Sequence, residues 1–170
     1  MQIDTIAPAD ATADLIDRLA ELLVDVVHRG ASIGFLAPLS TDTARSYWRS
    51  VVDALGSELH LWVARADDRI VGTVQLAPCP KQNGRHRADV QKLMVHSEHR
   101  GARIASALMD ALETRARALE RSLLVLDTEA GSGAESFYRG LGWIRAGEIP
   151  NYAANPAGRL HPTAYYYKLL

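Results

Sequence analysis

The feature that most constrains the fold is an apolar strand that leads through a basic turn into an amphipathic helix. Leu93-Met-Val95 has a strand pattern and is followed by the polar turn His96–Arg103. From Ile104 to Leu119, apolar residues recur at helical spacing and give the helix one apolar face. A strand and a helix joined by so short a turn form a βα unit, in which the helix packs back against a sheet. The segment therefore predicts an α/β chain.

The turn has the composition of an anion site. A helix N-terminus presents unpaired N–H groups and about half a positive charge, and small residues let a phosphate approach them. Gly101 and Ala102 are small, while Arg100 and Arg103 add positive charge. The turn contains neither G-x-G-x-x-G nor G-x-x-x-x-G-K, so it is not a dinucleotide fingerprint or a P-loop. An ordinary surface turn with its arginines in water is the competing interpretation, and this segment alone does not decide between the two.

Periodicity predicts the other elements. A helix is expected from Thr12 to Arg29, ended by Gly30, and a second from a cap at Thr41 or Asp42 to Gly56. The remaining expected elements are strands at Met1–Ile6, Leu59–Ala64, Ile70–Leu76, Ala88–Val95, Leu123–Leu126 and Thr163–Leu170, and a short helix at Ala134–Leu141. A hairpin-like first half followed by two βα units predicts an α/β (α+β) class with a mixed sheet. It argues against a mainly parallel, flavodoxin-like nucleotide-binding regulator.

Length and composition narrow the classes of protein further. A chain of 170 residues, 48% apolar, is expected to form one domain spanning residues 1–170. A net charge of -1 gives no overall field toward nucleic acid or an anionic membrane. Cys79 is the only cysteine, the start of the chain has no signal-peptide pattern, and the apolar runs are too short to span a bilayer. We therefore expect a soluble, cytoplasmic protein.

The basic turn resembles the pyrophosphate motif of the GNAT acetyltransferase superfamily. That motif, Q/R-x-x-G-x-G/A, matches Arg100-Gly-Ala-Arg-Ile-Ala105 at both ends. Arg103 stands where the family usually has a glycine that lets bare backbone touch the diphosphate. We expect Arg103 to present its N–H with a negative φ and to direct its guanidinium toward a phosphate. The resemblance implies the GNAT fold, a mostly antiparallel twisted mixed sheet flanked by helices, with a V-shaped splay between two parallel strands.

A second motif follows in the family order. Ala134-Glu-Ser-Phe-Tyr-Arg-Gly-Leu-Gly-Trp143 resembles the family ending A-x-x-F-Y-x-x-x-G-F. Phe137 is expected in the core, and the family position implies that Tyr138 faces the sulfur of coenzyme A. A packed tyrosine with its hydroxyl at the rim is the structural alternative for Tyr138. Gly131 replaces an asparagine that often holds the preceding loop, so one hydrogen bond is expected to be missing there.

Four further blocks look like the tabtoxin-resistance type of acetyltransferase: His28–Phe35, Asp89–Val95, Leu126–Ser132 and Gly158–Ala164. That branch acetylates an amine of a β-lactam antimetabolite. The resemblance implies an N-acetyltransferase that transfers the acetyl group of acetyl-CoA directly to a primary amine of a small molecule. An antibiotic or toxin such as a β-lactam amino acid is one candidate acceptor, which would give the protein a role in antibiotic resistance. The natural acceptor stays open.

Acetyl transfer from a thioester to an amine needs positioning, removal of one proton and assistance to the leaving thiolate. Tyr138 is the candidate donor to the sulfur. Asp127 ends an apolar strand, where open α/β sheets place ligand sites, and is the candidate base. Asp89, in the adjacent strand, is a second candidate and a water molecule is a third. The structural alternative for Asp127 is to cap the loop Thr128–Gly133.

The resemblance also implies the contacts of acetyl-CoA as co-substrate. They comprise the backbone of Leu93, Met94 and Val95 and the turn residues Arg100, Gly101, Ala102, Arg103, Ile104 and Ala105. On the acceptor side, Phe35 is a candidate in an exposed-looking loop. Glu129 is a weaker candidate for binding the substrate ammonium, with a solvated loop acid as its alternative. Gln91 and Lys92 stay unassigned because the sequence does not fix their register.

Other residue types exclude rival mechanisms. His96 and His99 have no third ligand at useful spacing, so no metal is expected. Cys79 has no recognisable activating partner, which favours direct transfer over a covalent intermediate. The expected partner is a small-molecule amine, with no nucleic acid and no membrane, and formation of a homodimer stays open. A catalytically silent module that binds acyl-CoA or regulates another protein is the alternative function.

Overall fold

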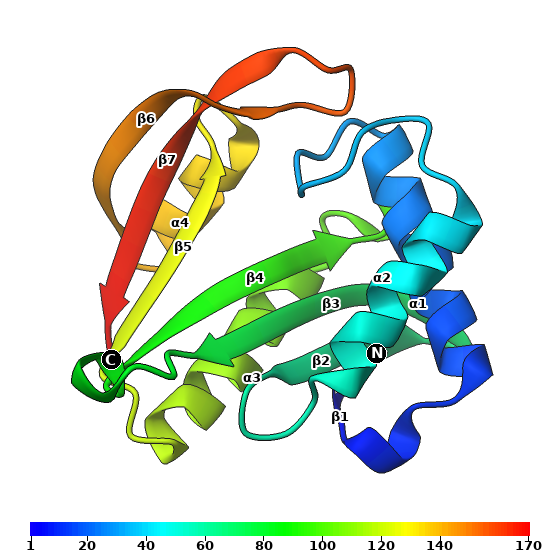
Figure 1. The fold of residues 1–170 in the computed structure, drawn as a ribbon, viewed down its shortest axis with the longest axis horizontal. Helices are drawn as coiled ribbons and strands as arrows, with labels where there is room; N and C mark the ends of the chain where they lie inside the picture. The colour runs from blue at the N-terminus through cyan, green and yellow to red at the C-terminus, as the bar shows by residue number, and fades with distance from the viewer.

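The computed structural model describes every residue from Met1 to Leu170 and contains one seven-stranded sheet (Figure 1). The strands are β1 (Gln2–Ile6), β2 (His60–Ala66), β3 (Arg69–Pro78), β4 (Arg87–Val95), β5 (Leu123–Glu129), β6 (Ile144–Ala154) and β7 (Leu160–Leu169). Their order in the sheet is β1-β2-β3-β4-β5-β7-β6, and only β4 and β5 are parallel. The mixed, mostly antiparallel sheet expected from the sequence is confirmed.

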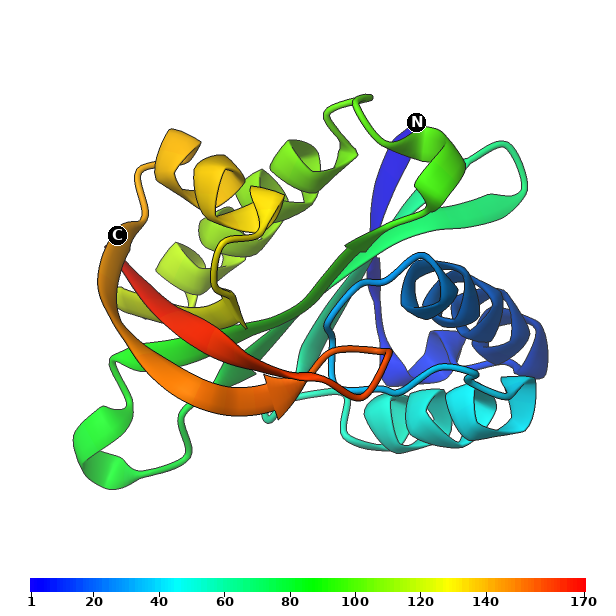
Figure 2. The same cartoon turned by 90° about the horizontal axis from the view of Figure 1, so that it is seen from above.

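Helices cover both faces of the sheet. They are α1 (Ala13–His28), α2 (Thr41–Asp53), α3 (Ile104–Ala118) and α4 (Gly133–Gly140), with short 3-10 turns η1 (Pro8–Asp10), η2 (Gln82–Gly84) and η3 (Ser97–His99). Figure 2 shows α1 and α2 on one face and α3 and α4 on the other. Each face has its own apolar core, one around Trp48 of α2 and the other around Leu108 and Leu112 of α3. No helix is both long and apolar enough to cross a membrane.

The two N-terminal helices form largely where the sequence predicts them. The Thr12 hydroxyl accepts a hydrogen bond from the backbone N–H of Leu15 at 3.1 Å, and Gly30 follows the helix with φ +89°. The predicted cap of the second helix is wrong, because Ser40 holds that position and accepts from the N–H of Thr43 at 3.1 Å. The second helix also ends before Gly56, at Asp53.

The sequence prediction misses β6 altogether. This strand lies at the edge of the sheet, pairs only with β7 and exposes nearly all of its side chains. Its pairing shifts register between Arg145 and Gly147 and again between Ile149 and Ala153. Without one buried face, the strand has no alternation of apolar and polar residues to detect.

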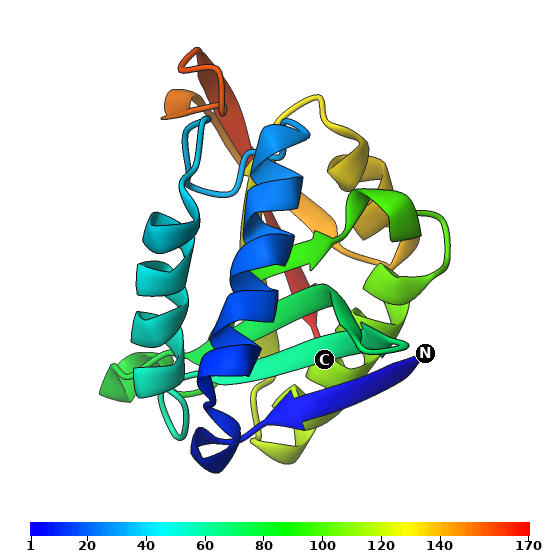
Figure 3. The ribbon, with the colours of Figure 1, turned by 90° about the vertical axis from the view of Figure 1, so that its right-hand side faces the viewer.

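The turn between β6 and β7 meets the loop between α1 and α2 (Figure 3). The backbone N–H of Ala37 donates to the carbonyl oxygen of Pro156 at 2.9 Å. These segments lie far apart in the sequence, yet they come together in the fold. The contact holds the α1–α2 loop next to the strands that carry the candidate site.

Candidate active site

The parallel strands β4 and β5 separate after a short paired stretch. They pair only from Arg87↔Leu123 to Asp89↔Val125. Beyond Asp89, β4 stays paired with β3 as far as Val95, and β5 stays paired with β7 as far as Glu129. The edge of β4 from Val90 to Val95 therefore has backbone groups with no strand beside them, and Figure 1 shows the two strands diverging. This is the V-shaped splay implied by the resemblance, and Leu93, Met94 and Val95 lie along its open edge.

Alternation along β4 and β5 places apolar side chains on the face of α3 and α4 and carboxylates on the face of α1 and α2. Leu124 and Leu126 of β5 pack in the core under α3 and α4. Since successive side chains of a strand point to opposite faces, Asp127 lies on the face of α1 and α2. Asp89 lies on the same face, because its neighbours Ala88 and Val90 belong to the α3 core. The two candidate bases thus share one face.

The basic turn ends in an open helix N-terminus. Arg103 is the residue before α3, and its side chain makes no capping hydrogen bond. The first turn of α3 also contains no acidic residue that could neutralise its free N–H groups. An added Cβ at Gly101 would meet no atom within 4 Å, which leaves the approach to these groups open. The turn fits an anion such as the diphosphate of coenzyme A.

The backbone of Arg103 differs from the expectation. Its φ is 58° and its ψ is 17°, a left-handed conformation, so the prediction of a negative φ is wrong. For a residue other than glycine this conformation costs about 1–2 kcal/mol. Arg103 therefore adopts a backbone shape that glycine would adopt at little cost, and its exposed guanidinium remains available to an anion.

The basic turn is anchored from beneath by α1. The carboxylate of Asp25 accepts from the backbone N–H of Ser97 and from its hydroxyl, both at 2.8 Å. Burial alone would raise the pKa of Asp25, but these bonds, with the nearby His96 ring and Arg29, lower it below its usual value. His96 is buried, and its Nδ1 accepts from the N–H of Glu98 at 3.3 Å. His96 therefore shapes the turn.

Tyr138 lies in α4 with its ring in the core. Its ring centroid is 5.9 Å from that of Trp143 and 6.2 Å from that of Tyr166. Burial raises the pKa of Tyr138 to about 12, with a further contribution from the negative charge of Asp127. The phenol is therefore protonated at neutral pH, and its hydroxyl makes no hydrogen bond within the protein. Phe137 is partly buried against the same core, as expected.

Asp127 and Asp89 both hold protons more tightly than ordinary aspartates. The Asp127 side chain reaches solvent, but the surrounding protein removes part of its hydration and so raises its pKa. The positive charge of Lys92 lowers the pKa and partly offsets this shift. Burial also raises the pKa of Asp89, opposed by Arg87 and assisted by Asp127. Asp127 lies inside β5, opposite Tyr165, and receives no hydrogen bond from the loop Thr128–Gly133. Asp127 therefore does not cap that loop.

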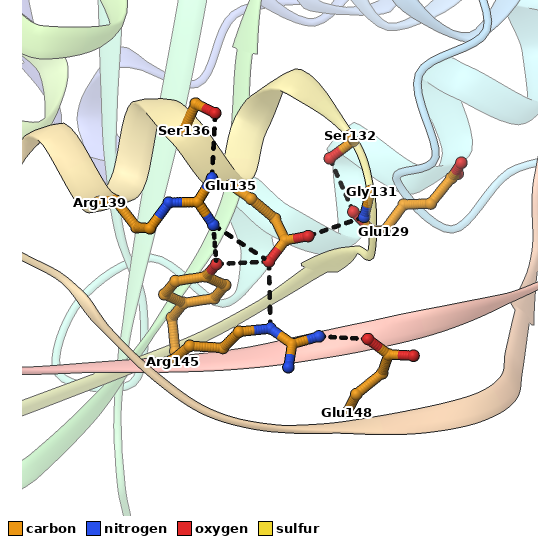
Figure 4. Close-up of polar contacts among 9 residues, drawn as sticks. Glu129, Gly131, Ser132, Glu135, Ser136, Arg139, Arg145 and Glu148 are labelled. Atoms are coloured by element: carbon orange, nitrogen blue, oxygen red, sulfur yellow. Dashed lines mark hydrogen bonds and ion pairs between the residues drawn. The ribbon is translucent and has the colours of Figure 1, made fainter.

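That loop is held by Glu135, which the sequence reasoning did not single out. Its carboxylate accepts from the N–H of Gly131 at 2.7 Å, from the Tyr166 hydroxyl, and from Nε of Arg145 at 3.2 Å (Figure 4). The Tyr166 bond, followed by the Gly131 bond, lowers the pKa of Glu135. The bond from the Gly131 backbone N–H to Glu135 thus holds the loop in place of the asparagine bond that the sequence lacks. A glutamate in the first turn of a short helix is too common a feature to reveal this network.

Two acceptor-side expectations change. Phe35 is half-buried, with its ring 5.2 Å from that of Tyr47 in an edge-on contact. Glu129 belongs to β5 and lies 3.4 Å from Nδ1 of His161, so it is not a solvated loop acid. The other ring nitrogen of His161 lies 3.2 Å from the Asn155 amide. These two contacts of His161 connect β5 to the β6–β7 turn.

Two residues outside the expected set complete the description. Lys92, which the sequence left unassigned, points to the face of α1 and α2 and donates to the carbonyl oxygen of Ile33 at 2.6 Å. Cys79 is buried, and the Arg87 guanidinium lies 3.4 Å from its sulfur. The structure contains no group of three or more His, Cys, Asp or Glu side chains placed to hold a metal ion.

Comparison with known proteins places the chain in a family. Residues 19–143 match the model of the acetyltransferase (GNAT) family. Since this match covers more than half of the 170 residues, the chain belongs to that family. N-acetyltransferase 8F1 from Mus musculus is 33% identical over 132 residues, which cover 68% of this chain and 60% of that protein. The chain thus spans less than two thirds of that relative.

Solved structures share the fold. Ribosomal-protein-alanine N-acetyltransferase from Brucella melitensis superposes with a TM-score of 0.80 at 22% identity, over 100% of both chains. yncA, a putative acetyltransferase from Salmonella typhimurium solved with acetyl-CoA, superposes with a TM-score of 0.76 at 19% identity, over 100% of this chain and 94% of that one. At these identities the similarity establishes the GNAT fold.

Proposed function

We propose that residues 1–170 form one N-acetyltransferase domain that transfers the acetyl group of acetyl-CoA directly to a primary amine of a small molecule. The observation that carries the proposal is the two-sided splay. Its open β4 edge leads through the basic turn to the uncapped N-terminus of α3, and Tyr138 in α4 has a free hydroxyl. The carboxylates of Asp127 and Asp89 lie on the face of α1 and α2. Family membership supports the same reaction class.

Different residues bind acetyl-CoA, remove the amine proton and assist the leaving sulfur. Acetyl-CoA, when bound, supplies a thioester carbonyl that a neutral amine attacks. The backbone of Leu93–Val95 and the turn Arg100–Ala105 hold this co-substrate. Asp127, directly or through water, takes the proton that the amine loses, and its raised pKa suits that task. Tyr138 keeps its proton at neutral pH and donates a hydrogen bond to the leaving sulfur.

The acceptor class is the finer part of the proposal. The four blocks that look like tabtoxin-resistance acetyltransferases favour an amine-bearing antibiotic or toxin, such as a β-lactam amino acid. The Brucella melitensis protein with the same fold is a ribosomal-protein-alanine N-acetyltransferase, so a peptide with an N-terminal alanine belongs in the same screen. A cytoplasmic setting remains part of the proposal.

The test combines binding and turnover. Calorimetry with acetyl-CoA should show saturable binding. Thiol release, followed over a panel of amine antibiotics, β-lactam amino acids, free amino acids and alanyl peptides, should identify at least one acceptor, and mass spectrometry should show a product heavier by one acetyl group. Absence of acetyl-CoA binding would overturn the proposal. Binding without turnover of any amine would favour the catalytically silent module instead.

A further inference from the structure

The three lysines of the chain differ in their surroundings. Lys81 is exposed, and Lys168 donates to both oxygens of Glu113 at 2.7 and 2.8 Å. Lys92 is half-buried on the α1 and α2 face of the splay, and it forms no ion pair with any carboxylate. Burial lowers its pKa, and the attraction of Asp127 opposes that shift. A half-buried cation without an anionic partner is costly, so its placement needs a reason.

The backbone is distorted to place Lys92 there. Its φ is 50°, in the left-handed region, and the β3–β4 pairing shifts register between Thr73 and Gln75, opposite this residue. The hydroxyl of Thr73 donates to the carbonyl oxygen of Lys92 at 3.0 Å and holds the bulge in place. A bulge re-aims side chains, and such bulges recur beside active sites. Here the side chain is aimed at the loop between α1 and α2.

The groups around the Lys92 ammonium are a backbone carbonyl and two aromatic rings, none of which carries a negative charge. Its nitrogen donates to the carbonyl oxygen of Ile33 at 2.6 Å and lies 5.7 Å from the ring centroids of both Phe35 and Tyr47. An added Cβ at Gly34 would lie 3.3 Å from that nitrogen, so glycine leaves it room. An ammonium has three N–H donors, and Ile33 uses one. The remaining donors are available to a ligand.

The opposite strand carries charges of the other sign. Asp127, with Glu129 two residues further along β5, lies across the splay from Lys92. An amine is recognised as an ammonium by carboxylates, whereas an anionic substituent on the same molecule would be recognised by the lysine. A separated pair of opposite charges fits a ligand that carries both.

Building on the proposed function, we infer that Lys92 binds a carboxylate of the acceptor, so the acceptor class is an amine that also carries a carboxylate, as amino acids do. Lys92 is then a specificity-determining residue. The same arrangement disfavours polyamines without an anionic group, because Lys92 would repel their extra charge.

Matched acceptors test the inference. Free amino acids and their carboxamides are compared as acceptors by kcat/KM, in wild type, Lys92→Met and the control Lys81→Met. The wild type and the control should prefer the carboxylate form. Lys92→Met should reduce that preference by about tenfold or more, because the carboxylate loses a charged donor while the carboxamide loses little. Expressing kcat/KM per neutral amine removes the difference in amine pKa between the two acceptor forms, and using the ratio of the two forms removes differences in protein stability between the variants.

A second variant addresses a purely structural role. Lys92→Arg keeps the charge and should retain the preference for carboxylates. An equal loss of both acceptors in Lys92→Met would mean that Lys92 only anchors the Ile33 loop, and would overturn the inference. Equal use of both acceptor forms by the wild type would also overturn it, while leaving the proposed function intact. No turnover of either form, or of any other amine, would overturn both.

Discussion

Asp25 of α1 accepts two hydrogen bonds from Ser97 of the basic turn, each 2.8 Å long. The bonds connect a helix on the proposed acceptor face to the turn proposed to hold the diphosphate. The backbone N–H of His96 also donates to the carbonyl oxygen of Val71 at 2.9 Å, so the start of the turn is held from two sides. The position of the turn thus depends on α1 as well as on β3.

Asp25→Asn should weaken acetyl-CoA binding. The substitution keeps the size of the side chain but removes the charge that strengthens both bonds, and the turn loses part of its support. We expect the dissociation constant for acetyl-CoA, measured by calorimetry, to rise about three- to tenfold. Asp14→Asn in the same helix, where the exposed Asp14 pairs only with Arg18, is the control and should leave it unchanged. Equal effects of the two variants would rule out an anchoring role for Asp25.

Tyr138→Phe should separate catalysis from cofactor binding. The ring packs against Trp143 and Tyr166, so removing only the hydroxyl should preserve the core. A lost proton donor typically lowers the rate by about 10²-fold or more. We expect kcat to fall by that order while the acetyl-CoA dissociation constant stays within about twofold. Tyr167→Phe is the matched control. Loss of affinity in proportion to rate would show that the hydroxyl serves binding alone.

Arg103→Gly tests the left-handed residue before α3. Glycine adopts a φ of 58° freely, so relief of strain should offset the greater entropy of the unfolded glycine chain, and the melting temperature should be maintained or raised. Arg103→Ala loses the same charge but keeps the strain, and it should melt at a lower temperature than the glycine variant. Both variants should bind acetyl-CoA more weakly than wild type at low salt, with the difference shrinking as salt rises. Unchanged affinity at low salt would show that the guanidinium does not contact the phosphates.

The sequence predicts those parts of the fold that follow from periodicity and local turn chemistry. The helix from Ile104 and the strand ending at Val95 are long, strongly patterned segments, and both lie within a residue or two of their predicted bounds. The placement of Phe137 against the apolar core also follows from its motif. Edge strand β6 escapes prediction because neither of its faces is buried.

Lys92 and Glu135 show what local pattern does not contain. The direction of Lys92 depends on one bulge opposite β3, and a shift of one residue would send the side chain to the other face. Two partners of Glu135, Arg145 and Tyr166, come from β6 and β7, up to 31 residues away in sequence. Such contacts exist only once the whole sheet has formed, and homologous motifs name neither residue.

Asp127→Asn should change activity without lowering stability. If Asp127 is the base, kcat/KM in the wild type rises with pH through a raised carboxylate pKa, above the usual value of about 3.9, and the variant loses this acidic limb. Turnover should fall by about 10²-fold. Because a raised folded pKa means that the ionised carboxylate opposes folding at neutral pH, its removal should leave the melting temperature equal or higher. Asp89→Asn provides the comparison. If Asp89→Asn abolishes the acidic limb and Asp127→Asn does not, the roles are reversed.

Glu135→Gln should lower stability in a way that depends on pH. The folded pKa of Glu135 is lowered, so its ionised form stabilises the fold above the usual pKa of about 4.3, and this contribution is lost as the pH falls through the folded value. At pH 7 we expect the variant to melt about 3–8 °C below wild type, since the bonds from Tyr166 and Arg145 lose their charged acceptor. The gap should narrow steadily in melting curves taken toward pH 3. Glu148→Gln removes the exposed partner of the same Arg145 and should cause little change at any pH. A gap that stays constant with pH would mean that the shape of Glu135, and not its charge, holds the β5–α4 loop.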